Sequence, residues 1–173
     1  MNIVRRNIKV KTPVNTSLER HPVPVLGIDY KVKIVYKNIK ITELDIENKT
    51  IKISLPNRYK KLQNDKILDL AIEKMYEQIA KVEIERAMEE TRILLGFAPE
   101  EFEIKDIENL GKCVNKKITI NPNVVMYSRK VIDYIVLHQY CHLKYKSHTK
   151  GFYKLLETYM PDYKKYEAIL LNM

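Results

Sequence analysis

The segment from residue 131 to residue 143 is apolar at nearly every position, although it also carries two histidines. A helix that is apolar on all sides is typical of the interior of a protein rather than its surface. Ser128, which precedes the segment, is a residue type that favours the N-cap of a helix. We therefore expect a buried helix that begins after Ser128, and the rest of the chain has to fold around it.

Hydrophobic periodicity predicts two kinds of structure before this helix. Apolar residues alternate with polar ones from residue 23 to residue 55, which predicts three or four antiparallel strands that end at Pro56. The spacing becomes helical from residue 64 to residue 95. About 30 residues is long for a single helix in a small domain, so a kink or break is expected near Ala80.

Shorter patterns complete the predicted fold. Apolar runs at residues 102–107 and 117–121 predict two strands of a small sheet, and residues 151–159 and 163–171 have helical spacing. The predicted fold class is therefore α+β, with N-terminal antiparallel strands, a long helix, a small sheet, the buried helix and C-terminal helices.

Composition limits the class of protein. The chain has 173 residues, of which 45% are hydrophobic and 31% charged, so we expect one folded domain over residues 1–173, with residues 1–22 as a candidate N-terminal arm. The 31 basic and 22 acidic residues give a net charge of +9. The lysines are scattered, which is typical of a solvated surface; a nucleic-acid or acidic partner would need them to converge on one side.

The cellular compartment follows from two absences in the sequence. No apolar window approaches the length that spans a membrane, and the chain does not start with an apolar stretch of signal-peptide length. We therefore expect a cytoplasmic protein. Its two cysteines, Cys113 and Cys141, are predicted to be reduced.

Three of the four histidines lie within eleven residues. His138 and His142 are four residues apart, so on a helix both imidazoles project from one face, close enough to share a zinc ion, and His148 follows just past the expected helix end. Three nitrogens and a water would make an open catalytic zinc site, whereas a closed structural site would need a fourth ligand. Cys141 points away from this face, and Cys113 could reach it only if the fold brings it there. The alternative is an ordinary pair of core or surface histidines.

The histidine pair lies in a segment that departs from the zinc-peptidase signature H-E-x-x-H. The sequence here is His138-Gln139-Tyr140-Cys141-His142. The glutamate of the signature accepts a proton from the attacking water and passes it to the leaving amine. Gln139 is nearly isosteric but cannot accept that proton. Metal binding is therefore expected to survive, while a lost general base lowers turnover by about 100-fold to 10,000-fold.

The chain resembles the YgjP-like metallopeptidases, which are related to the SprT-like zinc peptidases. The histidine segment follows that family's pattern of H-E-L-C-H-L and a third histidine, and further matching positions are Leu110-Gly111-Lys112-Cys113, Ile118-Thr119-Ile120-Asn121, Phe152-Tyr153 and Tyr159-Met160-Pro161-Asp162-Tyr163. Three positions depart from the family pattern, because the family has glutamate at 139, tryptophan at 110 and serine at 112.

Two origins of Gln139 stay open. It is either an exchange made to trap an inactive form of the enzyme, or the residue of a natural pseudopeptidase.

The resemblance implies a zincin-like fold in which residues 129–173 form the metal-binding helical part. It implies a Zn²⁺ ion held by His138, His142 and His148, and a zinc-dependent peptidase that hydrolyses peptide bonds of a peptide or protein substrate with residue 139 as general base. With Gln139 in place, this activity is expected to be impaired. The alternative is a non-catalytic zinc-containing binding module for a protein or a nucleic-acid-associated partner.

Zinc peptidases of this kind usually bind the substrate as an added strand along a sheet edge beside the metal helix. The strand at residues 117–121 is our candidate, with Ile118, Thr119 and Ile120 as substrate-binding residues, although an ordinary interior strand fits the same pattern. Four tyrosines near the motif in sequence are candidates for polarising the oxyanion: Tyr127, Tyr140, Tyr145 and Tyr153.

Overall fold

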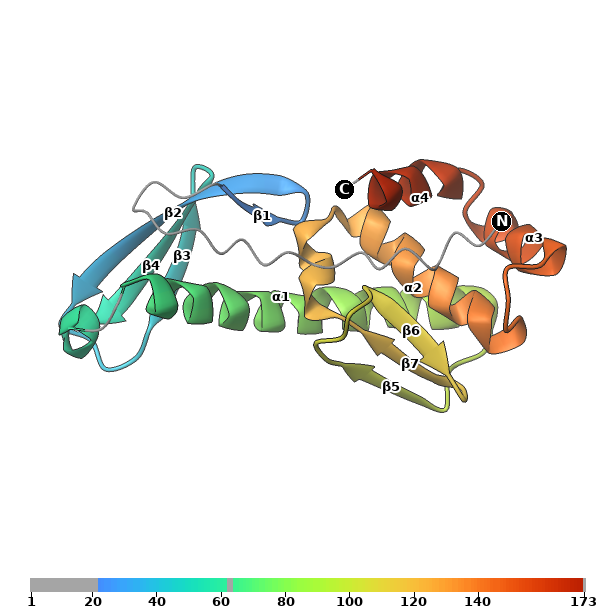
Figure 1. The fold of residues 1–173 in the computed structure, drawn as a ribbon, viewed down its shortest axis with the longest axis horizontal. Coiled ribbons are helices and arrows are strands. Elements are labelled where there is room, and N and C mark those ends of the chain that lie inside the picture. Colours follow the sequence, from blue (N-terminus) through green and yellow to red (C-terminus); the bar gives the residue numbers. More distant parts are fainter. Residues whose placement is uncertain (1–21, 62–63, 173) are drawn as a thin grey trace.

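The fold is taken from a computed structural model, which describes residues 22–61 and 64–172. The order of elements confirms the α+β class expected from the sequence. Two sheets lie at different positions along one long helix, and a layer of shorter helices covers the second half of that helix (Figure 1). Within the described residues, no helix is long and apolar enough to cross a membrane.

The N-terminal sheet is mixed, and the prediction of antiparallel strands alone was wrong. Its order is β1 (Val23–Val25), β2 (Ile28–Lys37), β4 (Thr50–Pro56) and β3 (Glu43–Glu47). The chain leaves β2, forms β3 at the outer edge and returns through β4 between them, so β2 and β4 run parallel. Only the β1–β2 and β3–β4 pairs are antiparallel hairpins.

The long helix α1 (Asn64–Leu95) is one unbroken element, so the break predicted near Ala80 was wrong. Ala80 is fully buried, and Met75 and Ile84 lie buried before and after it, so the same face packs against the protein through this point. Alanine is also the strongest helix former. The helix ends at Gly96, whose φ of +72° is the left-handed conformation that terminates many helices.

The small sheet contains one more strand than the sequence predicted. Its order is β5 (Glu101–Ile104), β7 (Lys117–Ile120) and β6 (Gly111–Val114). The turn between β6 and β7 is made by Asn115 and Lys116, both with positive φ, as a two-residue hairpin requires. A 3₁₀ turn, η3 (Pro122–Met126), then leads into the helical part; a similar turn, η2 (Asn57–Lys61), precedes α1.

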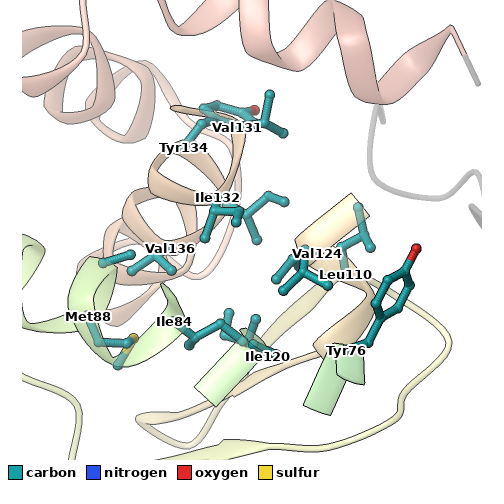
Figure 2. Packing of buried hydrophobic residues seen from close by; sticks show 14 of the residues in the cluster. Tyr76, Ile84, Met88, Leu110, Ile120, Val124, Val131, Ile132, Tyr134 and Val136 are labelled. Atoms are coloured by element: carbon teal, nitrogen blue, oxygen red, sulfur yellow. The ribbon is translucent and has the colours of Figure 1, made fainter. Parts of the chain in front are cut away.

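The helical part follows the predicted order and bounds closely. It consists of α2 (Arg129–Lys144), α3 (Lys150–Tyr159) and α4 (Tyr163–Leu171). Helix α2 lies between α1, the small sheet and the C-terminal helices, which is why it is buried. Figure 2 shows part of this core, in which Ile84 of α1, Ile120 of β7 and Val136 of α2 belong to one cluster of buried side chains.

Charged groups also join α1 to α2. Glu83 is 5% exposed, and its carboxylate accepts hydrogen bonds from Arg129 at 2.6 Å and from Arg86 at 3.2 Å. Arg86 extends the network to Asp133 of α2 at 2.8 Å. Because Arg129 and Asp133 stand in the first turns of α2, this network fixes the start of the helix that carries the histidine pair.

Candidate metal centre

The three clustered histidines meet at one point. The Nε2 atom of His138 lies 3.2 Å from Nε2 of His142 and 3.1 Å from Nε2 of His148. The three candidate ligand atoms all lie within 4.8 Å of one another. Three imidazole nitrogens that converge in this way are a donor set that suits a transition metal such as zinc.

The turn after α2 brings the third histidine back to the pair. Tyr145 ends α2, and its ring packs over Gly151, where a Cβ atom would come 2.7 Å from the tyrosine ring. Thr149 caps α3 by accepting a hydrogen bond from the Phe152 amide at 3.3 Å. These contacts hold both ends of the short segment that carries His148.

Phe152 forms a common floor under the three imidazoles. It is fully buried, and its ring centroid lies 5.0 Å from that of His138, 4.8 Å from that of His142 and 4.6 Å from that of His148. An apolar ring in this place limits the directions in which the imidazoles can turn. The nitrogen atoms therefore remain directed at one another and away from the core.

Burial favours the neutral form of these histidines. It lowers the pKa of His138 to about 3, with a smaller contribution from the neighbouring His142 and His148. The pKa values of His142 and His148 are also lowered, in both cases mainly by burial. Because a metal ion binds the neutral imidazole, the protein keeps these side chains in the form that can act as ligands.

The outer nitrogens of two histidines have partners within the fold. Nδ1 of His142 lies 3.0 Å from the backbone oxygen of Tyr145, to which it can donate. Nδ1 of His138 lies 3.4 Å from the hydroxyl of Tyr134. Partners of this kind fix the ring orientation and leave Nε2 free for a metal.

Among the described residues, the only His, Cys, Asp and Glu side chains gathered closely enough to hold a metal together are these three histidines. Cys141 is fully buried in the core, as predicted, and burial raises its pKa to about 12. Cys113 is half-buried on β6, and burial raises the pKa of its thiol too. The two cysteines lie apart and form no disulfide with each other.

Gln139 is buried against the small sheet. It is 7% exposed, and a Cβ atom placed on Gly111 would lie 3.0 Å from its Nε2 and 3.2 Å from its Cδ. The side chain at position 139 is therefore held between α2 and the first residue of β6. No hydrogen bond joins its carboxamide to another described residue, so both polar atoms keep their bonding capacity.

The strand predicted to bind substrate is not at a sheet edge. β7 lies between β5 and β6, so both sides of its backbone are already paired. Ile118 and Ile120 are fully buried, and Thr119 stands between them on the same central strand. The edge-strand prediction for Ile118, Thr119 and Ile120 was wrong, because periodicity does not tell which strands flank a given strand. The edge strand beside α2 is β6.

The tyrosines near the motif have separate surroundings. Tyr140 is buried, and its hydroxyl donates to the backbone oxygen of Met88 at 3.0 Å, so it is a core residue. Tyr145 packs over Gly151. Tyr153 is half-buried with its ring centroid 5.9 Å from that of His148. Tyr127 is half-buried at the end of η3.

Tyr134 and Phe152 contact the histidines but were not predicted from the sequence as residues of the site. Tyr134 stands four residues before His138, at the spacing that puts two side chains on one helix face, so this spacing could have indicated it.

Comparison with known proteins identifies the family of this chain. Residues 2–173 match the family described as YgjP-like, metallopeptidase domain. The sequence matches none of the curated proteins. Two solved structures are similar: the metallopeptidase zymogen of Pyrococcus abyssi abylysin (22% identity, 51% of this chain, 92% of that chain, TM-score 0.47) and that of Methanocaldococcus jannaschii jannalysin (20% identity, 52% of this chain, 88% of that chain, TM-score 0.45). With a family match over almost its whole length and a histidine triad in place, the chain belongs to the YgjP-like metallopeptidase family.

Proposed function

We propose that this chain is a zinc metallopeptidase whose peptide hydrolysis is impaired by Gln139. The convergence of three imidazole nitrogens, with no fourth His, Cys, Asp or Glu ligand among the described residues, carries the proposal. Catalytic zinc sites keep a coordination position open, whereas structural sites fill all four. A bound zinc ion would supply Lewis-acid chemistry, lowering the pKa of a water to about 7 and polarising the scissile carbonyl.

Each residue of the site has a distinct part in this proposal. His138, His142 and His148 bind the metal through Nε2, and their low pKa values keep them neutral. Gln139 occupies the position of the general base. Its carboxamide can hydrogen-bond the attacking water but cannot take its proton, and the proton transfer to the leaving amine is lost as well.

The substrate is proposed to add as a strand to β6. This strand forms the edge of the small sheet beside α2, and its first residue, Gly111, lies against Gln139. Backbone pairing with an extended peptide would place a peptide bond near position 139 without requiring a particular side chain. A protein or peptide is therefore the proposed substrate class.

A second candidate function is a non-catalytic module that holds a peptide beside its metal. The observation that favours it is Gln139 itself, because the amide removes the proton acceptor while the triad is complete. In that case the edge of β6 would bind a partner that is released intact. The two candidates differ only in whether the bound peptide bond is cleaved.

The experiment that separates them restores the carboxylate. Zinc-loaded wild-type protein, the Gln139→Glu variant and the Gln139→Glu, His142→Ala double variant are incubated with a peptide library, and cleavage products are identified by mass spectrometry. We expect Gln139→Glu to cleave peptides about 100-fold to 10,000-fold faster than the wild type, and the double variant to show no cleavage. A zinc-loaded Gln139→Glu variant that binds library peptides and cleaves none would favour the binding module.

A further inference from the structure

We infer that Tyr134 is a positioning residue of the metal centre, which acts by holding the outer nitrogen of His138 so that Nε2 faces the metal. The inference rests on the proposed function, because it assigns a role in metal binding. It concerns a residue of α2 that lies outside the ligand set and outside the H-x-x-x-H segment.

The geometry places the phenol directly against the histidine. The hydroxyl of Tyr134 is 3.4 Å from Nδ1 of His138, and the two rings meet edge to face with centroids 5.7 Å apart. Tyr134 is 4% exposed, so water has little access to the pair. The two residues are one helical turn apart on α2, and the helix therefore fixes their separation.

The chemistry of the imidazole explains why this contact matters. A neutral histidine that binds a metal through Nε2 carries its proton on Nδ1, and a buried N–H group needs an acceptor. The oxygen of Tyr134 is in place to accept from Nδ1 of His138. For His142 the same task falls to the backbone oxygen of Tyr145. Of these two partners, only Tyr134 can be removed by a substitution.

The surroundings of Tyr134 keep it in place as a neutral phenol. Its ring packs near that of Tyr166 of α4, with centroids 6.4 Å apart. Burial raises its pKa, and the charge of Glu167 on α4 raises it further. Helix α4 therefore packs, through Tyr166, against the residue that contacts His138.

The test replaces Tyr134 by phenylalanine, which removes only the hydroxyl oxygen, and replaces Tyr140 by phenylalanine as a matched control. Both tyrosines are buried on α2, but the hydroxyl of Tyr140 donates to Met88 on the side of α1. Zinc affinity is measured by competition with a chromophoric chelator for the wild type, Tyr134→Phe and Tyr140→Phe, after circular dichroism shows that each metal-free protein is folded. Loss of a group that orients a metal-binding histidine typically costs 10-fold to 100-fold in affinity, and we expect that loss for Tyr134→Phe alone.

A second readout follows the geometry of the site itself. The visible absorption bands of the cobalt-substituted protein respond to ligand orientation, so we expect them to shift in Tyr134→Phe and to stay unchanged in Tyr140→Phe. A wild type that binds zinc, together with a Tyr134→Phe variant of equal affinity and unchanged bands, would overturn the inference and leave the proposed function intact. Equal losses of zinc affinity in Tyr134→Phe and Tyr140→Phe would also overturn the inference, because they would reflect a general weakening of helix α2. A wild type that binds no zinc would instead contradict the proposed function.

Discussion

The ring of Phe152 stands edge-on against the ring of His148, with their centroids 4.6 Å apart and their planes at 85°. His148 lies in the turn before α3, and Phe152 lies in the first turn of that helix. The same phenyl ring also contacts His138 and His142. One apolar side chain therefore connects the ligand from the turn to the ligand pair on α2.

Replacing Phe152 by alanine should destabilise both the fold and the site. Removal of a fully buried phenyl ring costs about 3 to 5 kcal/mol, and the imidazoles lose the surface that limits their rotation. Urea unfolding of the metal-free protein measures the first effect and chelator competition the second. Phe102→Ala on β5 is the control, because that ring is partly exposed and distant in sequence. Equal effects of the two substitutions would contradict this role of Phe152.

The cap of α3 should contribute more stability than the cap of α2. The side chain of Thr149 accepts a hydrogen bond from the backbone of Phe152, whereas Ser128, at the N-cap of α2, makes no such bond. Thr149→Ala should therefore lower the free energy of unfolding by about 0.5 to 2 kcal/mol, as is typical for a lost cap. Ser128→Ala should have a smaller effect in the same urea titration. The reverse order would show that the Thr149 cap does not stabilise this end of the site.

The buried carboxylate of Glu83 should make stability depend on pH in the acid range. Its hydrogen bonds with Arg129 and Arg86 hold the pKa of Glu83 below its ordinary value. The native carboxylate is then stabilised above the unfolded pKa of about 4.3, and that contribution is lost as the pH falls through the lower native value. At pH 7, Glu83→Gln should cost about 1 to 3 kcal/mol.

The pH series distinguishes this charge effect from a general packing defect. The difference in unfolding free energy between wild type and Glu83→Gln should shrink as the pH falls below about 4. Glu90→Gln is the control, because Glu90 pairs with Arg86 at an exposed position and should change stability little. A difference that stays constant from pH 7 to pH 3 would contradict the assignment.

The close approach of Gly111 to Gln139 should appear as an energetic coupling. A methyl group at position 111 presses on the side chain of Gln139, so Gly111→Ala should lower the free energy of unfolding by about 1 to 3 kcal/mol. Without that contact, the same change would raise it by about 0.4 to 1 kcal/mol, because alanine lowers the conformational entropy of the unfolded chain. In a Gln139→Ala background the added methyl group has room, and the cost should disappear. A double-mutant cycle measured by urea unfolding tests this, and independent effects would contradict the contact.

The elements that the sequence predicted well are those whose pattern is local. The helix after Ser128, the helices at both sides of Pro161 and the end of α1 at Gly96 were all recognised from spacing and caps. The meeting of His138, His142 and His148 followed from their separation on one helix and a short turn. In each case the physical constraint acts between residues only a few positions apart.

The features that the sequence did not predict depend on contacts between distant segments. The pairing of β2 with β4, and the central place of β7, follow from the path of the chain through each sheet. The alternation of apolar and polar residues along a strand does not show which strands lie beside it. The strand β6 was missed because it begins with Gly111 and Lys112, two residue types that are uncommon in strands. The roles of Phe152 and Tyr134 appear only once three imidazoles are in place around them. Residues 1–21, which include the fourth histidine, His21, and all but the last residue of the predicted N-terminal arm, lie outside the described residues.

The metal centre is tested most directly by the zinc content of the purified protein, measured by elemental mass spectrometry after reconstitution and removal of free metal. Wild type and Gln139→Glu are compared with His138→Ala, His142→Ala and His148→Ala. We expect one zinc ion per chain in the first two proteins and a loss of zinc in each histidine variant. A wild-type protein that stays metal-free, or histidine variants that retain a full zinc ion, would contradict the proposal that these three side chains form the metal centre.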